Sequence, residues 1–249
     1  MFSIFLRQRH VRTKEWAKQF VQRPGEPKKH EIFMWFSAAV DTSYSQKSPD
    51  TIAFSYLGIT NKGKCIVLDE KLQQCRTGHP LAPSDTVKNL IDFLDRNKKE
   101  WGLARNVFLD SADQATMQEW NKYKRRNGCI YTLNDAWKKM EIIDRINAQL
   151  GWMAFDDQTG IEPCFYVLDT CSTYIHEMEH TVGKKIKTIH QKMGMTIWLT
   201  LCNTHGSHTR ARFTRGDNYE LASEFYCTAI PDRTCKRQGD YNQRSSYLP

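Results

Sequence analysis

The sequence lacks the features that mark secreted and membrane proteins. Its 249 residues contain neither a signal peptide nor an apolar run long enough to cross a membrane. Eight cysteines are present, but they are scattered and no two of them form a C-x-x-C pair. These absences favour thiols in a reducing compartment over a disulfide framework, and they predict that no membrane is among the partners of the chain.

A complete phosphate-binding loop is also missing. Residues Gly58 to Lys64 match the pattern G-x-x-x-x-G-K, but Cys65 follows where Ser or Thr would be needed to hold Mg²⁺. The run Cys65–Leu68 has the character of a strand, whereas a phosphate-binding loop leads into a helix. We therefore interpret Asn61–Lys64 as the turn of a hairpin and exclude nucleotide binding at this place.

Positive charge exceeds negative charge along the chain. Lys and Arg number 36 against 28 Asp and Glu, which gives a formal net charge of +8 and suits a polyanionic partner. Much of this charge lies in residues 7–30, which end in a Pro-Gly-Glu-Pro turn. We expect residues 1–30 to be a basic arm or linker with a short helix at Thr13–Val21. Such a segment is either a solvated leader or the end of an upstream part of the protein.

Three strands follow this segment. The runs Ile32–Val40, Thr51–Ile59 and Cys65–Leu68 are rich in β-branched, aromatic and small apolar residues and are separated by turn signals. Asp41 comes directly after the first run. A carboxylate that leaves the end of a strand is suited to a hard cation such as Mg²⁺, although an Asp in this position can also simply begin a turn.

Helices and strands then alternate. Residues Asp85–Trp101 have the period of an amphipathic helix with Ser84 as its N-cap, and Asn106–Leu109 is a short buried strand that ends in Asp110. A helix at Ala115–Tyr123, a strand at Cys129–Leu133 and a helix at Lys138–Leu150 complete the pattern. This order predicts an α/β fold with a mixed sheet flanked by helices. Because open α/β sheets place their sites at the carboxyl ends of strands, Asp41 and Asp110 are expected to converge there, share metal ions and activate water for phosphodiester cleavage.

Four stretches of this chain resemble a known family. They read AAVDTSYSQKSPDTIAFSYLGIT, LAPSDTVKNLIDFL, NVFLDSADQAT and KMEIIDRINAQLGWMAF, and in this order they are similar to the nuclease domain of the large terminase subunit of tailed phages. The resemblance covers about residues 32–180. It implies an RNase H-like nuclease domain at 31–180 that cuts double-stranded DNA during packaging, with Asp41 and Asp110 as ligands of Mg²⁺ or Mn²⁺. It also implies an upstream packaging ATPase, partnership with the terminase small subunit and the portal, and a place in the cytoplasm of a bacterial host.

The third acidic ligand of that family is absent from its expected place. It should follow the helix Ser172–His180, within a segment similar to E-D-x-N-D-H, and no such segment follows His180 here. If one base was lost after the His180 codon, residues 181–201 can be read as Y-C-W-K-E-D-K-D-N-T-P-E-D-G-N-D-H-M-V-N-S. Because methionine has one codon, the glycine spanning Met193–Gly194 and the aspartate spanning Met195–Thr196 in this reading are fixed.

The shifted reading has the family's ending in place and in order. It continues as V-Q-Y-A-W-I-P-Y, and a stop codon is available across Gly216–Asp217. We therefore hypothesise that residues 181–249 are an irregular, out-of-frame tail without a consistent structural pattern. We interpret Leu72–His79 as a smaller shift of the reading frame that a second shift compensates.

A second motif supports a different function. Residues His176 to His180 read H-E-M-E-H, which matches the H-E-x-x-H signature of zinc proteases with Glu177 as the base. Ile186 stands where a third histidine ligand should be, and Glu179 puts a charge into a helix that such enzymes bury. A surface helix is the plainer interpretation. A zinc metalloprotease and an inactive prophage remnant are the two alternatives to the nuclease.

Two further groups of residues have ordinary structural explanations. Lys122, Lys124, Arg125 and Arg126 can contact phosphates without reading sequence, or can simply be the solvated end of a helix. The cysteines and histidines after residue 181 have the composition of a zinc module, but their spacing matches no standard zinc finger. A poorly packed tail is the better interpretation of that region.

Overall fold

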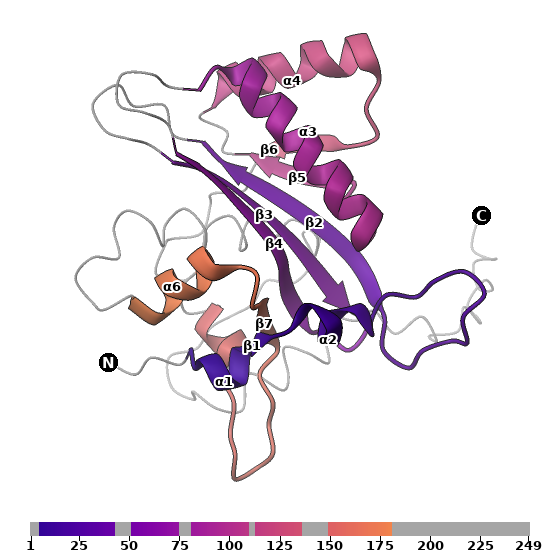
Figure 1. Ribbon diagram of the computed structural model, residues 1–249, viewed down its shortest axis with the longest axis vertical. Coiled ribbons are helices and arrows are strands. Elements are labelled where there is room, and N and C mark those ends of the chain that lie inside the picture. Colours follow the sequence, from indigo (N-terminus) through magenta and orange to yellow (C-terminus); the bar gives the residue numbers. More distant parts are fainter. Residues whose placement is uncertain (1–4, 43–50, 75–80, 110–112, 136–148, 181–249) are drawn as a thin grey trace, which may run out of the picture. The chain divides into compact units, whose positions relative to one another are not determined.

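The computed structural model describes residues 5–42, 51–74, 81–109, 113–135 and 149–180. These residues form a seven-stranded sheet in the order β1-β7-β4-β3-β2-β5-β6, with helices on both of its faces (Figure 1). The α/β fold class predicted from the sequence, a mixed sheet flanked by helices, is confirmed. That this sheet is RNase H-like stays a prediction. The expected irregular tail at 181–249 and most of the expected helix Lys138–Leu150 lie outside the described residues.

Three antiparallel strands form the centre of the sheet. They are β2 (Phe33–Asp41), β3 (Thr51–Thr60) and β4 (Cys65–Gln74), joined in register by pairs such as Ala39↔Ser55 and Ser55↔Glu70. The turn between β3 and β4 is closed by the amide of Gly63, which donates to the carbonyl of Thr60 at 3.0 Å. Gly63 has a φ of 82°, a conformation that glycine adopts without the steric cost of a side chain. The predicted hairpin turn is thus confirmed, and Cys65 begins a strand.

Strand β4 is longer than the sequence indicated. It runs six residues past the predicted end at Leu68, and Leu72, Gln73 and Gln74 still pair with β3. Leu72 also packs against the hydrophobic core. The first three residues of the suspected slip at 72–79 therefore continue a regular strand, and residues 75–79 lie outside the described part of the chain.

Parallel strands extend the sheet on the other side of β2. Strand β5 (Asn106–Leu109) has the predicted bounds and pairs with β2, and β6 (Thr132–Asp135) pairs with β5. The prediction of a strand at Cys129–Leu133 was wrong by about three residues. Helix α4 (Gln114–Asn127) also runs four residues past its predicted end at Tyr123, because its last turn is rich in Lys and Arg, good helix formers that also complement the helix dipole. This helix ends only at Gly128, with a φ of 67°.

One face of the sheet is covered by α3 (Pro83–Glu100) and α4. The even-numbered side chains of β2 and β3 point to this side, and the Phe93 ring on α3 lies 5.7 Å from that of Phe54 and 6.2 Å from that of Tyr56. All side chains predicted for the apolar face of this helix are buried: Val87, Leu90, Ile91, Leu94 and Trp101. The predicted Ser84 N-cap is wrong, because Pro83 begins the helix and Ala82 precedes it. Proline is favoured at that first position because its fixed φ is helical.

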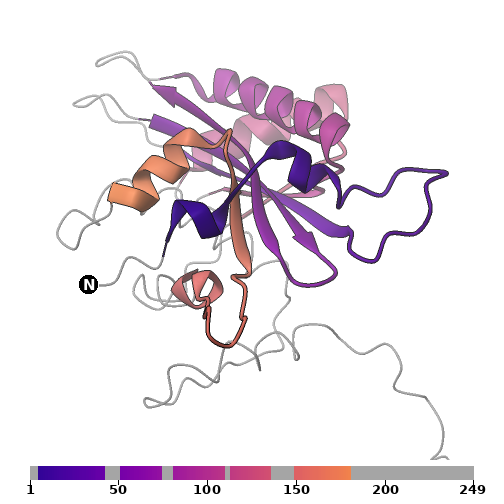
Figure 2. The ribbon, with the colours of Figure 1, turned by 60° about the horizontal axis from the view of Figure 1, so that its bottom comes forward.

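The opposite face carries α6 (Ser172–His180), whose bounds are as predicted (Figure 2). This helix follows β7 (Phe165–Leu168), which pairs in parallel with β4. Tyr174 and Ile175 are buried against the sheet. The Tyr174 ring lies 6.1 Å from that of Phe165, so the helix returns directly over the strand that precedes it.

Residues 5–30, expected as a basic arm or linker, contribute to this sheet. After α1 (Arg7–His10), strand β1 (Val11–Arg12) pairs with β7. Helix α2 (Lys14–Lys18) begins with the side chain of Thr13 as its cap. Apolar side chains of this segment, Phe5, Ala17 and Phe20, are buried in the common core.

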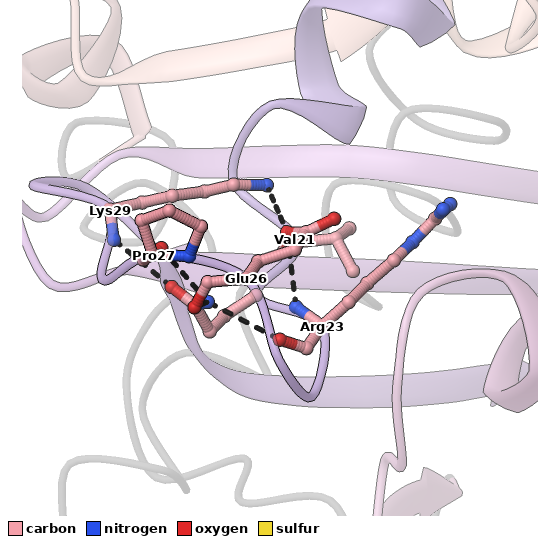
Figure 3. A network of polar contacts seen from close by, with 6 residues as sticks. Val21, Arg23, Glu26, Pro27 and Lys29 are labelled. Atoms are coloured by element: carbon pink, nitrogen blue, oxygen red, sulfur yellow. Dashed lines mark hydrogen bonds and ion pairs between the residues drawn. The ribbon is translucent and has the colours of Figure 1, made fainter.

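The loop after α2 is closed by its own polar contacts (Figure 3). The Lys29 ammonium donates to the carbonyl of Val21 at 2.6 Å and lies 3.0 Å from the Glu26 carboxylate. The Gln22 side chain accepts the Lys29 amide at 3.0 Å and donates to the carbonyls of Glu26 and Pro27. These bonds hold the two ends of residues 21–29 together and lead the chain into β2.

Candidate metal-binding edge of the sheet

Asp41 is the last residue of β2, at the edge of the sheet where two parallel strands end together. Its side chain is 9% exposed, and Ala53 of β3 lies beside it. On the other side of β2, Val40 is in register with Leu109, the last residue of β5. Each of these two paired residues is followed in the sequence by an aspartate, Val40 by Asp41 and Leu109 by Asp110. Asp110 itself lies outside the described residues, so its convergence with Asp41 stays a prediction.

The start of α4 is fastened to the same edge. One carboxylate oxygen of Asp113 accepts a hydrogen bond from the hydroxyl of Thr42, and the other accepts the amide of Thr116 at 3.0 Å. Asp113 is thus both the N-cap of α4 and a link to the end of β2. Because residues 110–112 connect β5 to this cap, both ends of that short connection are held beside Asp41.

The donor set at this edge suits a hard cation. A carboxylate at the end of a buried strand, with a second carboxylate next in sequence to the neighbouring strand, is oxygen chemistry of the kind that Mg²⁺ and Mn²⁺ prefer. Within the described residues, no three His, Cys, Asp or Glu side chains are grouped so that they could hold a metal ion. The described residues alone therefore do not make up a metal site, and Asp110 lies outside them.

Sequence reasoning missed a half-buried carboxylate on β4. Glu70 lies on the same face of the sheet as Asp41, because it pairs with Ser55 and Ser55 pairs with Ala39. Its two carboxylate oxygens accept the amides of Thr173 and Tyr174 at 2.7 and 2.9 Å, and so cap the N-terminus of α6 from the sheet. Burial raises the pKa of Glu70, although these two hydrogen bonds oppose the rise. No sequence signal relates Glu70 to a helix that lies a hundred residues later.

Beside Glu70 the sheet contains a polar atom with no hydrogen-bond partner in the described structure. The Ser55 hydroxyl is fully buried in the ladder between Ala39 and Glu70. A buried hydroxyl without a partner costs free energy. Ser55 therefore adds a small cost to the face of the sheet that carries Asp41.

Glu177 of the H-E-M-E-H motif lies one turn along α6 from the residues that Glu70 caps. Burial raises its pKa to about 7, and the negative charge of Glu70 adds to the rise. The two carboxyl groups are thus coupled across the contact between α6 and the sheet. A proton bound to Glu177 relieves both the burial of its charge and the repulsion from Glu70.

This coupling predicts how stability depends on pH. A carboxyl group whose pKa is raised from 4.5 to about 7 by folding binds its proton more tightly in the folded state. The contribution of Glu177 to the unfolding free energy should therefore be fully present below pH 4.5 and should fall on the order of 1 kcal/mol by pH 7, after discounting for the partial exposure of the side chain. Urea unfolding at several pH values measures this fall. The Glu177→Gln variant should show a flatter profile, and an unchanged profile would contradict the assignment.

The motif residues do not form a zinc site within the described structure. His176 is exposed on α6, while Tyr174 and Ile175 point into the core. The side chain of His180 and the whole of Ile186 lie outside the described residues. The helix therefore has the character of a surface helix with one buried side, and the protease remains an alternative that the geometry does not favour.

The basic end of α4 is exposed. Lys124, Arg125 and Arg126 are exposed, and Lys122 pairs with Glu119 at 3.1 Å within the helix. The Arg125 side chain donates to the carbonyl of Asn121. These contacts fit a solvated helix end, and they leave the guanidinium of Arg126 accessible to phosphate.

Comparison with known proteins yields little. No protein-family model matches the chain, and no curated protein matches it. Among solved structures, the Aquifex aeolicus member of the Ppx/GppA protein family is 12% identical, with 41% of this chain and 35% of that chain covered and a TM-score of 0.28. The match spans about a third of that protein, and a likeness this low carries no argument. In the described part of the chain, every helix is too short or too polar to cross a membrane.

Proposed function

We propose that this chain contains the metal-dependent nuclease domain of a large terminase subunit of a tailed phage, which cuts double-stranded DNA during packaging. The observation that carries the proposal is the register of β2 and β5. The parallel pairing ends at Val40 and Leu109, and the next residue after each is an aspartate, Asp41 as the last residue of β2 and Asp110 directly after β5. Paired carboxylates at the carboxyl ends of adjacent strands are a suitable support for the metal chemistry of phosphodiester cleavage.

Asp41 and Asp110 would hold Mg²⁺ or Mn²⁺. When bound, the metal would supply an activated water and stabilise the leaving oxygen. Asp41 contributes a carboxylate whose strand is fixed on both sides, by β3 and by β5. Thr42 and Asp113 hold the start of α4 against that strand end. Rigid support of this kind is what a site for catalysis needs.

The partners and place of this domain follow from the same proposal. Double-stranded DNA is the substrate, the terminase small subunit and the portal are the protein partners, and the cytoplasm of the bacterial host is the site of action. The third acid of such a site lies beyond His180 in the restored reading frame. In its present frame we expect the chain to bind metal weakly and to cut DNA feebly or not at all with Mn²⁺, as an inactive remnant would.

Binding of Mn²⁺ tests this proposal independently of cleavage. Titration of the 249-residue chain, followed by electron paramagnetic resonance of the free ion, should show binding that Asp41→Asn or Asp110→Asn weakens at least about tenfold. Asp135→Asn is the matched control. Asp135 ends the next parallel strand, but its register with Leu109 places it on the opposite face from Asp41.

Two outcomes would contradict the proposal. One is Mn²⁺ binding that survives both substitutions. The other is binding that depends on His176 and His180, which would favour the zinc protease. In that second case, zinc-dependent cleavage of an unfolded protein substrate by the same chain should also be measurable and should be lost in His176→Ala.

A further inference from the structure

Helices α3 and α4 end at the edge of the sheet where β5 and β6 begin. Residues 101–105 lead from α3 into β5, and residues 128–131 lead from α4 into β6 (Figure 1). Because Asn106 and Thr132, the first residues of these parallel strands, are in register, both helix ends lie at the same edge. Asp41 ends β2, which is parallel to β5, so this edge is opposite to the metal-binding edge.

Two hydrogen bonds join the segments at this edge. The phenol of Tyr131 donates to the carboxylate of Asp95 on α3 at 2.7 Å, and the amide of Thr132 donates to the carbonyl of Arg105 at 2.7 Å. The Tyr131 ring is buried. The connection that follows α4 is therefore fastened both to α3 and to the residues before β5, and the side chains that extend outward from these segments share one surface.

Exposed cations gather on this surface. We call the following six of them the basic edge: Lys98, Lys99, Arg105, Lys124, Arg125 and Arg126. Among the described residues, none of the six forms an ion pair with a carboxylate, whereas cations elsewhere do, as Lys64 does with Glu31 at 2.5 Å. The charge of the basic edge is thus available to a partner outside the chain.

The carboxylates of α3 and α4 that lie toward these helix ends have partners of their own. Asp95 accepts from Tyr131, Glu100 pairs with Lys14 at 2.5 Å, and Glu119 pairs with Lys122 at 3.1 Å. Asp92 is exposed, but it precedes Lys98 by nearly two turns of α3, which is about 9 Å along the helix. The basic edge therefore has an excess of positive charge.

Helix stability does not account for the whole basic edge. Cations in the last turn of a helix interact favourably with its dipole, which explains the Lys and Arg residues at the ends of α3 and α4. Arg105 belongs to no helix, and its carbonyl is bonded to the start of β6. Like charges gathered at one place repel one another, so a polyanion bound there relieves a cost that folding leaves in place.

We propose that the basic edge binds the phosphate backbone of duplex DNA without reading its sequence. Two packed helices lie about 8–10 Å apart and each is about 10–12 Å wide with its side chains, so the basic edge is on the order of 20 Å across. A duplex carries one negative charge per about 1.7 Å of its axis, so it presents several phosphates over that length. Lys and Arg side chains are common donors to phosphate oxygens.

The basic edge is separate from the metal-binding edge. Ser37, Ala39 and Phe108 lie between the two edges and are buried, so a duplex does not lie along this face of β2 and β5. The basic edge therefore holds a stretch of duplex other than the one at Asp41. The inference goes beyond the proposed nuclease function and does not depend on it.

This assignment is for duplex DNA and not for a protein partner. The exposed large apolar residues near this edge are Met34 and Trp35 on β2 and Ile130 before β6, and β5 separates the two strands. A stable protein interface has a contiguous apolar centre from which charged residues are depleted. Six cations with apolar residues only on separate strands fit a polyanion better.

Binding of a labelled duplex tests the basic edge. A fluorescein-labelled DNA duplex longer than two helical turns is titrated with the full chain in EDTA, so that no cleavage occurs, and fluorescence anisotropy is followed over a salt series. The double variant Arg105→Gln, Arg126→Gln removes two charges from the basic edge. It should weaken binding at least about tenfold and lower the slope of log K against log salt by about 0.9 for each lost phosphate contact.

The matched control is the double variant Lys28→Gln, Lys88→Gln. It removes the same charge from exposed residues away from the basic edge, in the loop after α2 and in the first half of α3, and should weaken binding less than about twofold. The variant Arg105→Lys, Arg126→Lys keeps both charges and should bind within about twofold of the unsubstituted chain. Thermal unfolding of each variant confirms that it is folded.

Three results would overturn the proposal. Equal weakening by the two glutamine pairs would place the DNA contacts elsewhere on the chain, and absence of binding by the unsubstituted chain would exclude a DNA surface. Polyglutamate that displaces the label as strongly as unlabelled duplex does would show a general anion surface. Failure of the nuclease function gives a different pattern, because Mn²⁺ binding would then be independent of Asp41 while the loss of DNA binding in Arg105→Gln, Arg126→Gln persists.

Discussion

Replacing Asp41 with alanine should abolish DNA cleavage by a chain whose reading frame has been restored after the His180 codon. We expect plasmid cleavage in Mn²⁺ to fall at least about a hundredfold, more than the loss typical when a partner of a metal ligand is removed. Asp41 is 9% exposed at the end of a strand whose neighbours on both sides fix its position. Gel analysis of nicked and linear plasmid measures the rate.

The comparison needs two further chains. Asp135→Ala in the restored chain should cut DNA at the unsubstituted rate, since Asp135 belongs to the other face of the sheet. The chain in its present frame should cut feebly or not at all, because the third acid is missing. Robust metal-dependent cleavage by the present chain would show that residues 181–249 have been misinterpreted, and cleavage by the Asp41→Ala chain would exclude the assigned site.

Replacing Glu70 with alanine should markedly lower the free energy of unfolding. Its carboxylate accepts two amides at the start of α6, and alanine leaves both without this partner. Hydrogen bonds to a charged acceptor contribute about 1.5–3 kcal/mol each, so we expect the free energy of unfolding to fall by about 2–4 kcal/mol after allowing for partial exposure. Urea unfolding measures it.

Glu70→Gln separates the charge from the hydrogen bonds. Glutamine keeps one acceptor and removes the repulsion from Glu177, so this variant should lose less than half as much stability as Glu70→Ala and should lower the pKa of Glu177. Glu119→Ala removes an exposed ion pair and should cost less than about 0.5 kcal/mol. Equal losses for Glu70→Ala and Glu119→Ala would show that Glu70 does not hold α6 on the sheet.

Local sequence patterns were sufficient for much of the fold. The strand Asn106–Leu109 and the helix Ser172–His180 have their predicted bounds, because short apolar runs and amphipathic periods are local signals. The end of β4 was missed because Asp69 and Glu70 interrupt the apolar pattern. Their charges are satisfied from a distance, Asp69 by Arg96 and Asn97 of α3 and Glu70 by the amides of α6.

The N-terminal segment illustrates the same limit. Its basic residues suggested an arm, but their partners are acids far along the chain, such as Glu179 for Arg7 at 2.8 Å and Glu100 for Lys14 at 2.5 Å. Strand β1 is two residues long, which is too short for an alternation of polar and apolar residues to be recognised in the sequence. Its pairing with β7 depends on contacts that only the folded chain brings together.

For the candidate site too, the sequence predicted some features and could not predict others. The sequence indicated that Asp41 and Asp110 each follow a strand. The structure shows that Asp41 is the last residue of β2, and that the residues before the two aspartates, Val40 and Leu109, are in register on parallel neighbouring strands. Register is a property of two strands and is not encoded in either strand alone. The contribution of Thr42 and Asp113 was likewise beyond sequence reasoning, because their hydrogen bond joins residues that are 71 positions apart.

The location of bound Mn²⁺ tests the central claim most directly. The restored chain should be crystallised with Mn²⁺, and an anomalous difference map should be calculated near the manganese absorption edge. The account predicts a peak at the carboxyl ends of β2 and β5, within about 2.0–2.3 Å of carboxylate oxygens of Asp41 and Asp110. A peak held by His176 and His180 on α6, or a map without a peak beside Asp41, would contradict it.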